Sequence, residues 1–342
     1  MTKKTEIVRA PRAEIAQTSD WAEIDEMVDL MLSEKAASTA KTYAEDYRNF
    51  ARWAGAASPP EALGKLLENG PGPANRIVLA YKAHLKTCKR TGRNGVVKEG
   101  YAVATVNRRL QALRSFVQTA RMFGRVNWGL DVRGDAVTPY RDTRGPGQEA
   151  IGKMLEVLEA RKVSSRPGVS ADVNRATALR DTAIIRLMYD NGLRRIEILR
   201  IDLPDDLDRP GARIQILGKK RADREWLTLA PKTLAVIDAW IEERGEDAGP
   251  MFCALRGTSR GQRLTDRSLT RLITAIGKAA GVRVSPHGLR HTSITAALDA
   301  SGGDLRATAK FSRHKNWRDI QHYDDARDDF AGDIAKKISE DV

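Results

Sequence analysis

A stretch of glycine, proline and charged residues near the middle of the chain most constrains its fold. Between residues 131 and 147 lie five residues that interrupt helices and strands: Gly134, Pro139, Gly145, Pro146 and Gly147. The chain, at 342 residues, is also too long for a comfortable single core. We therefore predict two domains joined by a linker at residues 133–148.

The part before the linker has the spacing of helices. Apolar residues recur every three or four positions in two segments, one at Tyr43, Tyr47, Phe50 and Trp53 and the other at Val106, Leu110, Leu113 and Phe116. Ser38 and Thr39 precede the first segment, and their hydroxyl groups can cap a helix there. We expect an all-helical domain over residues 21–132, after a flexible arm at residues 1–20.

Beyond the linker, helical patterns are interrupted by two short runs with strand-like alternation. The runs cover residues 212–217 and 225–230, and a basic segment at residues 218–224 lies between them as a predicted hairpin tip. We therefore predict a mixed α/β domain over residues 149–327. The whole chain is then expected to be mainly α-helical with a small antiparallel β-sheet.

The last segment, residues 328–342, has an apolar stripe of its own. Three large apolar residues recur at four-residue spacing: Phe330, Ile334 and Ile338. A short helix with such a stripe can pack on its own domain or dock into a neighbouring protomer. Both alternatives stay open at the level of the sequence.

The net charge and the cysteine content limit which partner and which cellular compartment are expected. The formal net charge is +13 and the pI is about 9.8, which points to a polyanionic partner, nucleic acid first. A basic protein without such a partner is the alternative. Cys88 and Cys253 lie far apart and form neither a metal-ligand spacing nor a disulfide framework. No apolar run has the length of a signal peptide or a membrane span, so we expect a cytoplasmic, nucleoid-associated protein.

Four of the five histidines fall in one window near the C-terminus, together with an arginine and a tyrosine. The window contains His287, Arg290, His291, His314, His322 and Tyr323. Arginine can clamp a phosphate through two parallel hydrogen bonds, and histidine moves protons near neutral pH. Tyrosine can attack phosphorus and hold it covalently. The window therefore predicts phosphoryl transfer that needs no metal or cofactor.

Two further cations would serve such a reaction, because negative charge builds up on the non-bridging oxygens and on the leaving oxygen. The best candidate for a second arginine is Arg194, which follows Gly192 at the end of an apolar helix. Lys219, in the basic hairpin tip, could protonate the leaving 5′-oxygen. Within the window, we expect His291 to be a structural neighbour of the His287-x-x-Arg290 motif and His322 to be solvated.

Taken in order, these motifs resemble those of the tyrosine recombinases, the phage integrase family. The ordered set is Gly192-Leu193-Arg194-x-x-Glu197, the lysine hairpin, His287-x-x-Arg290, His314 and, nine residues later, Tyr323. The resemblance extends from about residue 35 to Tyr323. It implies a helical core-binding domain of SAM-like fold before the linker and a catalytic domain of the DNA breaking–rejoining fold after it.

The resemblance also implies the roles of the five residues that would surround the phosphate. Tyr323 would attack it and form a 3′-phosphotyrosyl link, while Arg194 and Arg290 would hold the non-bridging oxygens. His287 would assist proton transfer from the tyrosine. His314 would donate a hydrogen bond to the phosphate.

Two segments depart from the family pattern. The hairpin has Lys220 where the family's Gly-Lys-Gly has its second glycine, so that Lys219 and Lys220 are rival candidates for the general acid. The family's Leu-Gly-His is replaced by Ser312-Arg313-His314, which removes a glycine and adds a charge.

Glu197, in the Gly192-Leu193-Arg194-x-x-Glu197 motif, would support the site by orienting its arginines and histidines.

Double-stranded DNA with a specific recombination site is the partner that the resemblance implies, bound by a tetramer on two such sites. Basic residues expected to contact this DNA are Arg48, Lys86, Lys89, Arg90, Arg93, Arg108, Arg109, Arg114, Arg221 and Arg224. Three of them, Arg108, Arg109 and Arg114, are predicted to point away from the apolar face of their helix.

The favoured function is a site-specific recombinase for the integration, excision or resolution of mobile or chromosomal DNA. A type IB topoisomerase has a similar residue set but commonly carries lysine or arginine at the position of His287, which favours the recombinase. A catalytically silent DNA-binding protein of the same fold is the other alternative. Loss of the tyrosine or of an arginine would be its sign, and neither is lost.

Overall fold

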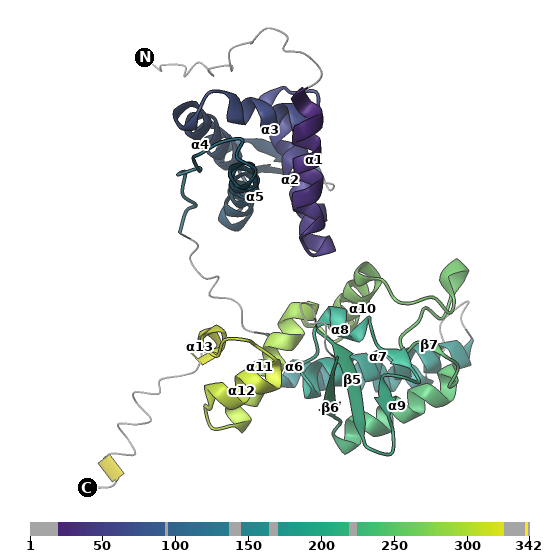
Figure 1. Ribbon diagram of the computed structural model, residues 1–342. Helices are drawn as coiled ribbons and strands as arrows, with labels where there is room; N and C mark the ends of the chain where they lie inside the picture. The colour runs from purple at the N-terminus through teal and green to yellow at the C-terminus, as the bar shows by residue number, and fades with distance from the viewer. Residues whose placement is uncertain are drawn as a thin grey trace. The chain divides into compact units, whose positions relative to one another are not determined.

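The computed structural model describes residues 20–92, 95–136, 145–163, 170–218, 224–324 and 339–340 (Figure 1). Contacts divide the chain into two compact units, the first ending at Pro139 and the second beginning at Tyr140. Each unit has a hydrophobic core of its own. The predicted fold class is confirmed, because both units are mainly helical and the paired strands are antiparallel.

The N-terminal unit is mainly helical but not all-helical as predicted, because a two-stranded hairpin lies between two of its helices. The helices are α1 (Asp20–Ser33), α2 (Ala37–Ala54), α3 (Pro59–Glu68), α4 (Pro71–Thr87) and α5 (Val103–Met122). Their apolar faces meet in one core, where Tyr47, Phe50 and Phe116 are buried. Gly64 of α3 faces the Trp21 ring of α1 so closely that any β-carbon there would clash.

The predicted cap of α2 is wrong. Ser38 and Thr39 lie inside the first turn, and Ala36 precedes the helix without a side-chain cap. A side-chain cap is found instead at α3, where the Ser58 hydroxyl accepts a hydrogen bond from the Glu61 N–H at 3.3 Å. Pro59 follows this cap, and the fixed φ of proline suits the first position of a helix.

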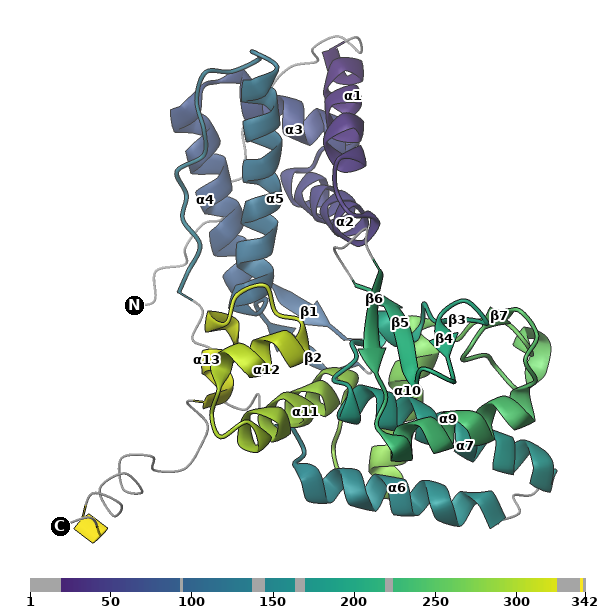
Figure 2. The same cartoon turned by 60° about the horizontal axis from the view of Figure 1, so that its bottom comes forward.

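A two-stranded hairpin separates α4 from α5 in the N-terminal unit (Figure 2). Its strands are β1 (Lys89–Thr91) and β2 (Val97–Glu99). The Tyr101 ring anchors the base of the hairpin between two guanidinium groups, because Arg90 and Arg109 each lie 4.0 Å from its centroid. Arg90 also donates a hydrogen bond to the Gly100 carbonyl at 2.9 Å.

The C-terminal unit combines helices with short strands. Its helices are α6 (Gln148–Val163), α7 (Ala171–Asp190), α8 (Arg195–Ile198), α9 (Pro231–Arg244), α10 (Asp266–Ala279), α11 (Pro286–Ala300), α12 (Leu305–Ser312) and α13 (Arg318–Asp324), with a short 3-10 turn, η1 (Gly257–Ser259). Its strands are β3 (Asp202–Leu203), β4 (Leu207–Asp208), β5 (Arg213–Leu217), β6 (Arg224–Thr228) and β7 (Gly249–Pro250).

The predicted strands pair as a hairpin. β5 and β6 run antiparallel with Ile214 opposite Leu227, β4 extends this sheet on the other side of β5, and β3 pairs separately with β7. The hairpin tip, residues 219–223, lies outside the described residues.

Helix α7 forms the centre of the C-terminal unit. Its residues from Ala178 to Ile185, and Leu187 and Met188, are buried, and it packs against α6, α9 and α11. The end of α7 therefore has a fixed position, and the segment that follows it begins the candidate site. Helices α11, α12 and α13 contact one another and supply the rest of that site (Figure 2).

Candidate active site

The turn after α7 sets the position of Arg194, the first of the predicted arginines along the chain. Gly192 has a φ of 57°, a left-handed conformation that favours glycine. A β-carbon at this position would lie 3.0 Å from the Phe311 ring and 3.3 Å from the Ser293 hydroxyl. The turn places Arg194 directly before α8, where its N–H donates a hydrogen bond to the Glu197 carboxylate at 2.7 Å.

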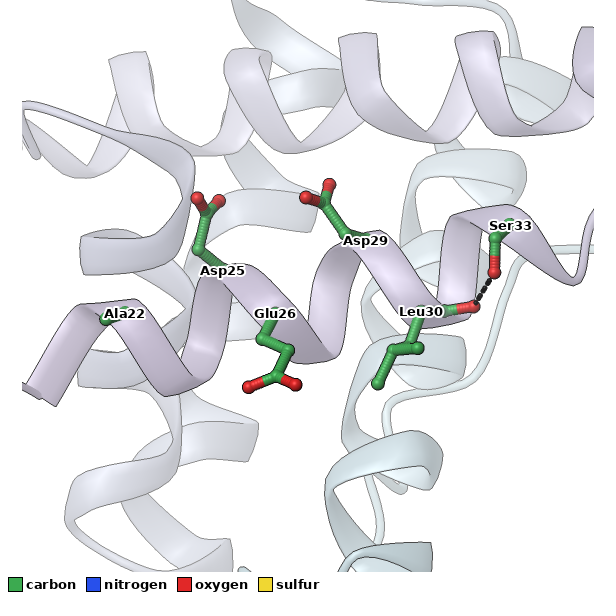
Figure 3. A pocket seen from close by; sticks show the side chains of 6 residues that line it. All are labelled: Ala22, Asp25, Glu26, Asp29, Leu30 and Ser33. Atoms are coloured by element: carbon green, nitrogen blue, oxygen red, sulfur yellow. Dashed lines mark hydrogen bonds between the residues drawn. The ribbon is translucent and has the colours of Figure 1, made fainter.

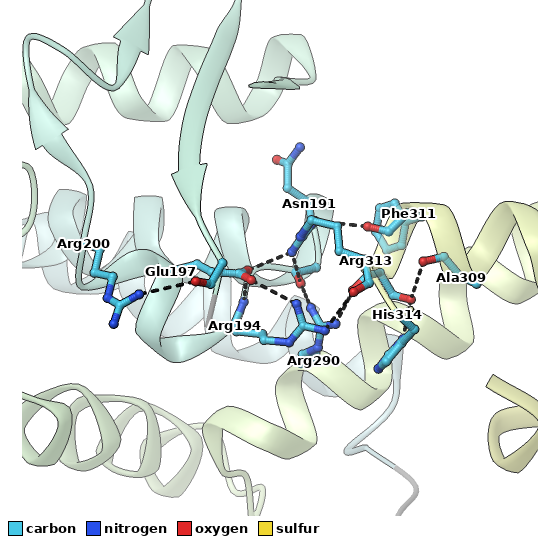
Figure 4. Close-up of polar contacts among 12 residues, drawn as sticks. Asn191, Arg194, Glu197, Arg200, Arg290, Ala309, Phe311, Arg313 and His314 are labelled. Atoms are coloured by element: carbon cyan, nitrogen blue, oxygen red, sulfur yellow. Dashed lines mark hydrogen bonds and ion pairs between the residues drawn. The ribbon is translucent and has the colours of Figure 1, made fainter. Parts of the chain in front are cut away.

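Glu197 is a fully buried carboxylate that contacts two guanidinium groups. Its Oε1 accepts from Arg194 Nη1 at 3.0 Å, and its Oε2 accepts from Arg313 Nη2 at 2.9 Å (Figure 4). Burial acts to raise the pKa of Glu197, but the Arg313 guanidinium and the N–H and guanidinium of Arg194 together hold it below its ordinary value. The carboxylate is therefore charged at neutral pH and orients both arginines.

The second predicted arginine, Arg290, joins the same cluster from α11. Its guanidinium (Figure 4) donates hydrogen bonds to two carbonyl oxygens, that of Gly192 in the turn after α7 and that of Ser312 at the end of α12. Burial, followed by the positive charges of Arg194 and Arg313, lowers the pKa of Arg290 to about 9. The guanidinium still carries its charge at neutral pH, in a region where positive charge is concentrated.

The first turn of α11 supplies His287. Ser285 caps this helix by accepting a hydrogen bond from the Gly288 N–H at 3.1 Å. The start of the C-terminal unit packs against the same turn, since a β-carbon on Gly145 would lie 2.4 Å from the Gly288 carbonyl oxygen and 2.0 Å from the Thr292 hydroxyl. The end of the predicted linker is thus fitted closely to the helix that carries His287 and Arg290.

His291 links His287 to the tyrosine. The two Nε2 atoms of His287 and His291 are 2.7 Å apart, and the His291 ring lies 4.7 Å from the Tyr323 ring at an angle of 33°. Burial, then the charge of Arg290, lowers the pKa of His287. Burial, then His287 and Arg290, lowers the pKa of His291 to about 4. Both rings are neutral at pH 7, so one nitrogen must donate to the other.

His314 and Tyr323 complete the cluster. His314 Nδ1 is 2.6 Å from the Ser312 hydroxyl, and its ring lies 6.5 Å from that of Tyr323. Burial, then Arg290 and Arg194, lowers the pKa of His314 to about 4. Burial raises the pKa of Tyr323, whereas Arg290 and Arg194 act to lower it. The phenol is therefore protonated at rest, close enough to both arginines to sense their charge.

The structure thus brings together the predicted residues Arg194, Glu197, His287, Arg290, His314 and Tyr323. Lys219, Lys220 and Arg221 lie outside the described residues, as does Arg93. From the sequence, His291 had been expected only to be a structural neighbour, and Arg313 had been given no role. The extra charge of Ser312-Arg313-His314 is the signal that could have identified Arg313.

One predicted DNA-contacting residue is corrected. Arg109 does not point outward but is 7% exposed, and its guanidinium is held between the Tyr101 ring at 4.0 Å and Asp46 at 3.6 Å. Its neighbour Arg108 is more exposed but forms an ion pair with the same carboxylate at 2.6 Å. Asp46 therefore holds both arginines in the structure, and Arg109 belongs to the interior.

Most of the other described basic candidates have partners within the protein. Lys86 pairs with Asp135 at 2.7 Å and Arg48 with Glu45 at 2.8 Å, while Arg114 donates to the Val132 carbonyl and Arg224 pairs with Asp206. Lys89 is exposed on β1. Arg90 lies against Tyr101, as described above.

A hollow on α1 has the opposite charge (Figure 3). It is lined by Asp25, Glu26 and Asp29 with Leu30 and Ser33. Carboxylates repel phosphates, so this face of α1 is unsuited to a DNA backbone.

Two further features bear on the kind of protein. Among the described residues no group of three or more His, Cys, Asp and Glu side chains converges as metal ligands. No helix in the described ranges is long and apolar enough to span a membrane.

Known proteins are similar to this chain in sequence and in fold. A model of the phage integrase family matches residues 168–329. A tyrosine recombinase of Synechococcus elongatus is 35% identical over 334 residues, which cover 95% of each chain. A solved structure of the XerH site-specific recombinase bound to palindromic difH substrate has a TM-score of 0.61 at 17% identity, covering 94% of this chain and 95% of that one. A structure of a lambda integrase tetramer bound to a Holliday junction has a TM-score of 0.58 at 14% identity, covering 89% of this chain and 76% of that one.

The fold is therefore that of the DNA breaking–rejoining enzymes of the integrase type. The chain belongs to the phage integrase family and is a tyrosine-type site-specific recombinase.

Proposed function

We propose that this recombinase cleaves DNA at a specific site through a 3′-phosphotyrosyl intermediate, with Tyr323 as the nucleophile. The observation that carries the proposal is the position of Tyr323, whose ring lies 4.7 Å from that of His291 and 6.5 Å from that of His314. There the charges of Arg290 and Arg194 act to lower the phenol pKa, which burial raises. Two guanidinium groups near a partly buried tyrosine suit a reaction in which a phosphodiester gains negative charge.

In the cleavage step, the Tyr323 oxygen forms a bond to phosphorus and the bond from phosphorus to the 5′-oxygen breaks. Arg194, Arg290 and His314 bind the non-bridging oxygens, and His287 accepts the phenol proton. The leaving 5′-oxygen takes a proton from Lys219 or Lys220. The phosphotyrosyl ester conserves the bond energy, so rejoining is the reverse reaction with the 5′-hydroxyl of a partner strand.

The partner in this proposal is double-stranded DNA at a specific recombination site, bound at the nucleoid by four copies of the chain on two sites. Two features support it: the net charge of +13, and the likeness in fold to recombinases solved on DNA. The biological outcome is integration, excision or resolution of mobile or chromosomal DNA.

A groove on the C-terminal unit has the chemistry to bind an apolar segment of a neighbouring protomer. The groove lies among α7, α11 and α12 and is lined mainly by small and apolar side chains, among them Tyr189, Ala296, Ala297, Ala300 and Phe311. The apolar stripe of the C-terminal segment, residues 328–342, has the matching chemistry. We assign the groove to this segment of a second copy, which would connect each active site to the next in a ring.

Covalent trapping tests the proposed chemistry. Inverted repeats around a short spacer in the DNA that flanks the gene give a candidate substrate, which is nicked so that cleavage cannot be reversed. The parent should form a protein–DNA band that survives denaturation, and Tyr323→Phe should bind the DNA without forming that band. An equally strong band from Tyr323→Phe would assign the nucleophile elsewhere.

A further inference from the structure

Arg313 occupies a backbone conformation that is unfavourable for it. It caps the C-terminal end of α12 with a φ of 57° and a ψ of 39°, in the left-handed region. Every residue with a β-carbon is strained there, and the Leu-Gly-His motif that Ser312-Arg313-His314 resembles has glycine at this position. An arginine at this position therefore needs compensating interactions of its side chain.

The side chain of Arg313 is buried and makes those interactions (Figure 4). Nη1 donates hydrogen bonds to the carbonyl oxygens of Asn191 and Phe311, both at 3.1 Å. Nη2 donates to the Gly192 carbonyl at 2.8 Å and to Glu197 Oε2 at 2.9 Å. Both Nη atoms of the guanidinium are therefore engaged by the protein, so Arg313 acts on the site through its neighbours.

These bonds connect the loop of Arg194 to the loop of His314. The Gly192 carbonyl accepts from Arg313 and from Arg290, and the Arg313 carbonyl accepts from Arg194 Nη2 at 3.2 Å. Both arginines assigned to the phosphate are thus tied to Arg313, directly or through one shared carbonyl. A change in the Arg313 side chain would loosen the two loops together.

The charge of Arg313 also changes the electrostatic balance of the cluster. Arg194, Arg290 and Arg313 gather around Glu197, and the Glu225 carboxylate is near enough to act on the pKa of Arg313. Burial lowers the pKa of Arg313, while Glu197 opposes that shift through its charge and its hydrogen bond. The positive charge of the three arginines exceeds the negative charge of Glu197, which contacts Arg194 and Arg313 and acts on Arg290 through its charge. A bound anion would balance this excess.

We propose that Arg313 is a positioning residue of the phosphate site. Its guanidinium aligns Arg194 through Glu197, and its charge adds to the positive potential that receives the scissile phosphate. The inference rests on the proposed role of Arg194 and Arg290 as phosphate ligands.

Three variants of the full-length protein separate charge from alignment. Arg313→Lys keeps the charge but cannot bridge the same set of acceptors. Arg313→Met removes the charge at similar length, and Arg313→Gly removes it while relieving the left-handed strain. Arg244→Met is the matched control, because Arg244 also donates to several carbonyls, those of Pro250, Gly245 and Asp247, in the turn after α9.

The first measurement is the affinity of each protein for inorganic orthovanadate in the absence of DNA. Binding is detected as a rise in the unfolding temperature with increasing orthovanadate concentration. Arg313→Lys and Arg244→Met should stay within about threefold of the parent, whereas Arg313→Met and Arg313→Gly should bind about tenfold more weakly, the scale of one removed charge a few ångströms beyond contact. Parent-like affinity in Arg313→Gly would overturn the charge contribution. An affinity of Arg313→Lys as low as that of Arg313→Met would reduce Arg313 to a packing residue.

The second measurement is the rate of covalent adduct formation on the nicked DNA. Arg313→Lys should be slower than the parent by about tenfold or more, because correct charge without alignment does not place the arginines at the transition state. A parent-like rate in Arg313→Lys would overturn the alignment contribution. Should the parent itself form no adduct, the proposed function fails, and the orthovanadate series would still decide the effect of the charge.

Discussion

His291 is a histidine whose surroundings keep it uncharged. His287 lies at hydrogen-bonding distance, the Tyr323 ring covers it, and Arg290 and His314 act on it through their charge. A second charge would be poorly tolerated among these groups. The neutral ring instead contacts both His287 and Tyr323 and fixes their relative positions. The structural role expected for His291 therefore consists of these two contacts.

The pKa of His291, about 4 in the folded protein, predicts a loss of stability in mild acid. The ordinary histidine value is near 6.5, so the unfolded chain binds the proton more readily between those two values. This source of stability is complete above pH 6.5 and is lost as the pH falls toward 4, by an amount on the order of 1–2 kcal/mol at pH 5. Urea unfolding at pH 7 and pH 5 should show a smaller decrease for His291→Asn than for the parent. Equal decreases would contradict the prediction.

Single residues also mark the limit of what the sequence can predict. Arg194, His287, Arg290, His314 and Tyr323 could be anticipated to meet, because their order and spacing match one known arrangement. The burial of Arg109 could not, because it depends on Asp46 and Tyr101 from other segments. The left-handed conformation of Arg313 depends in the same way on acceptors more than a hundred positions away.

At the scale of elements, the turn between α7 and α8 is held in place by contacts from several neighbouring elements. Its direction is set by Gly192, whose φ is positive and whose open side faces Phe311 and Ser293. Since the carbonyl of the same residue accepts from Arg290 and Arg313, a displaced turn would move all three arginines.

Gly192→Ala should therefore destabilise the protein by about 1–2 kcal/mol, the cost of a left-handed residue with a β-carbon, and slow adduct formation further than that loss explains. Gly152→Ala is the control, because Gly152 lies in α6 with nothing near its missing β-carbon and an ordinary helical φ. This second change should stabilise the protein by about 0.5–1 kcal/mol. Thermal unfolding and covalent trapping measure both effects, and a Gly192→Ala protein as stable and active as the parent would contradict the argument.

Helices were the elements best predicted from the sequence. The spacing of apolar residues in α2, α5 and α7 reflects the side that faces a core, and that spacing is local information. The start of α2 was wrong, because a hydroxyl residue near a helix start does not show which position is the cap. Strands β3 and β7 are two residues long and pair across distant segments, so no alternation could reveal them.

At the scale of the whole molecule, the assignment of the groove among α7, α11 and α12 predicts a defect in assembly. Deleting residues 328–342 should leave binding to a single DNA site intact and impair the joining of two sites, because the proposed contact links protomers rather than protein and DNA. Native gel shift with one-site and two-site DNA measures both. Ala297→Trp, which fills the groove from α11, should reproduce the defect with the segment intact. If the truncated protein assembles two sites as well as the parent does, the segment is not needed for contact between protomers. It would then pack on its own domain or make no contact that assembly requires.

The close fit of Gly145 against the first turn of α11 has a mechanical consequence. Gly145 and Gly147 lie against the helix that carries His287 and Arg290, so a force on the chain at this point would act first on side chains proposed for catalysis. A pull on the chain before Gly145, such as bound DNA could exert, is therefore expected to displace the residues proposed to hold the phosphate.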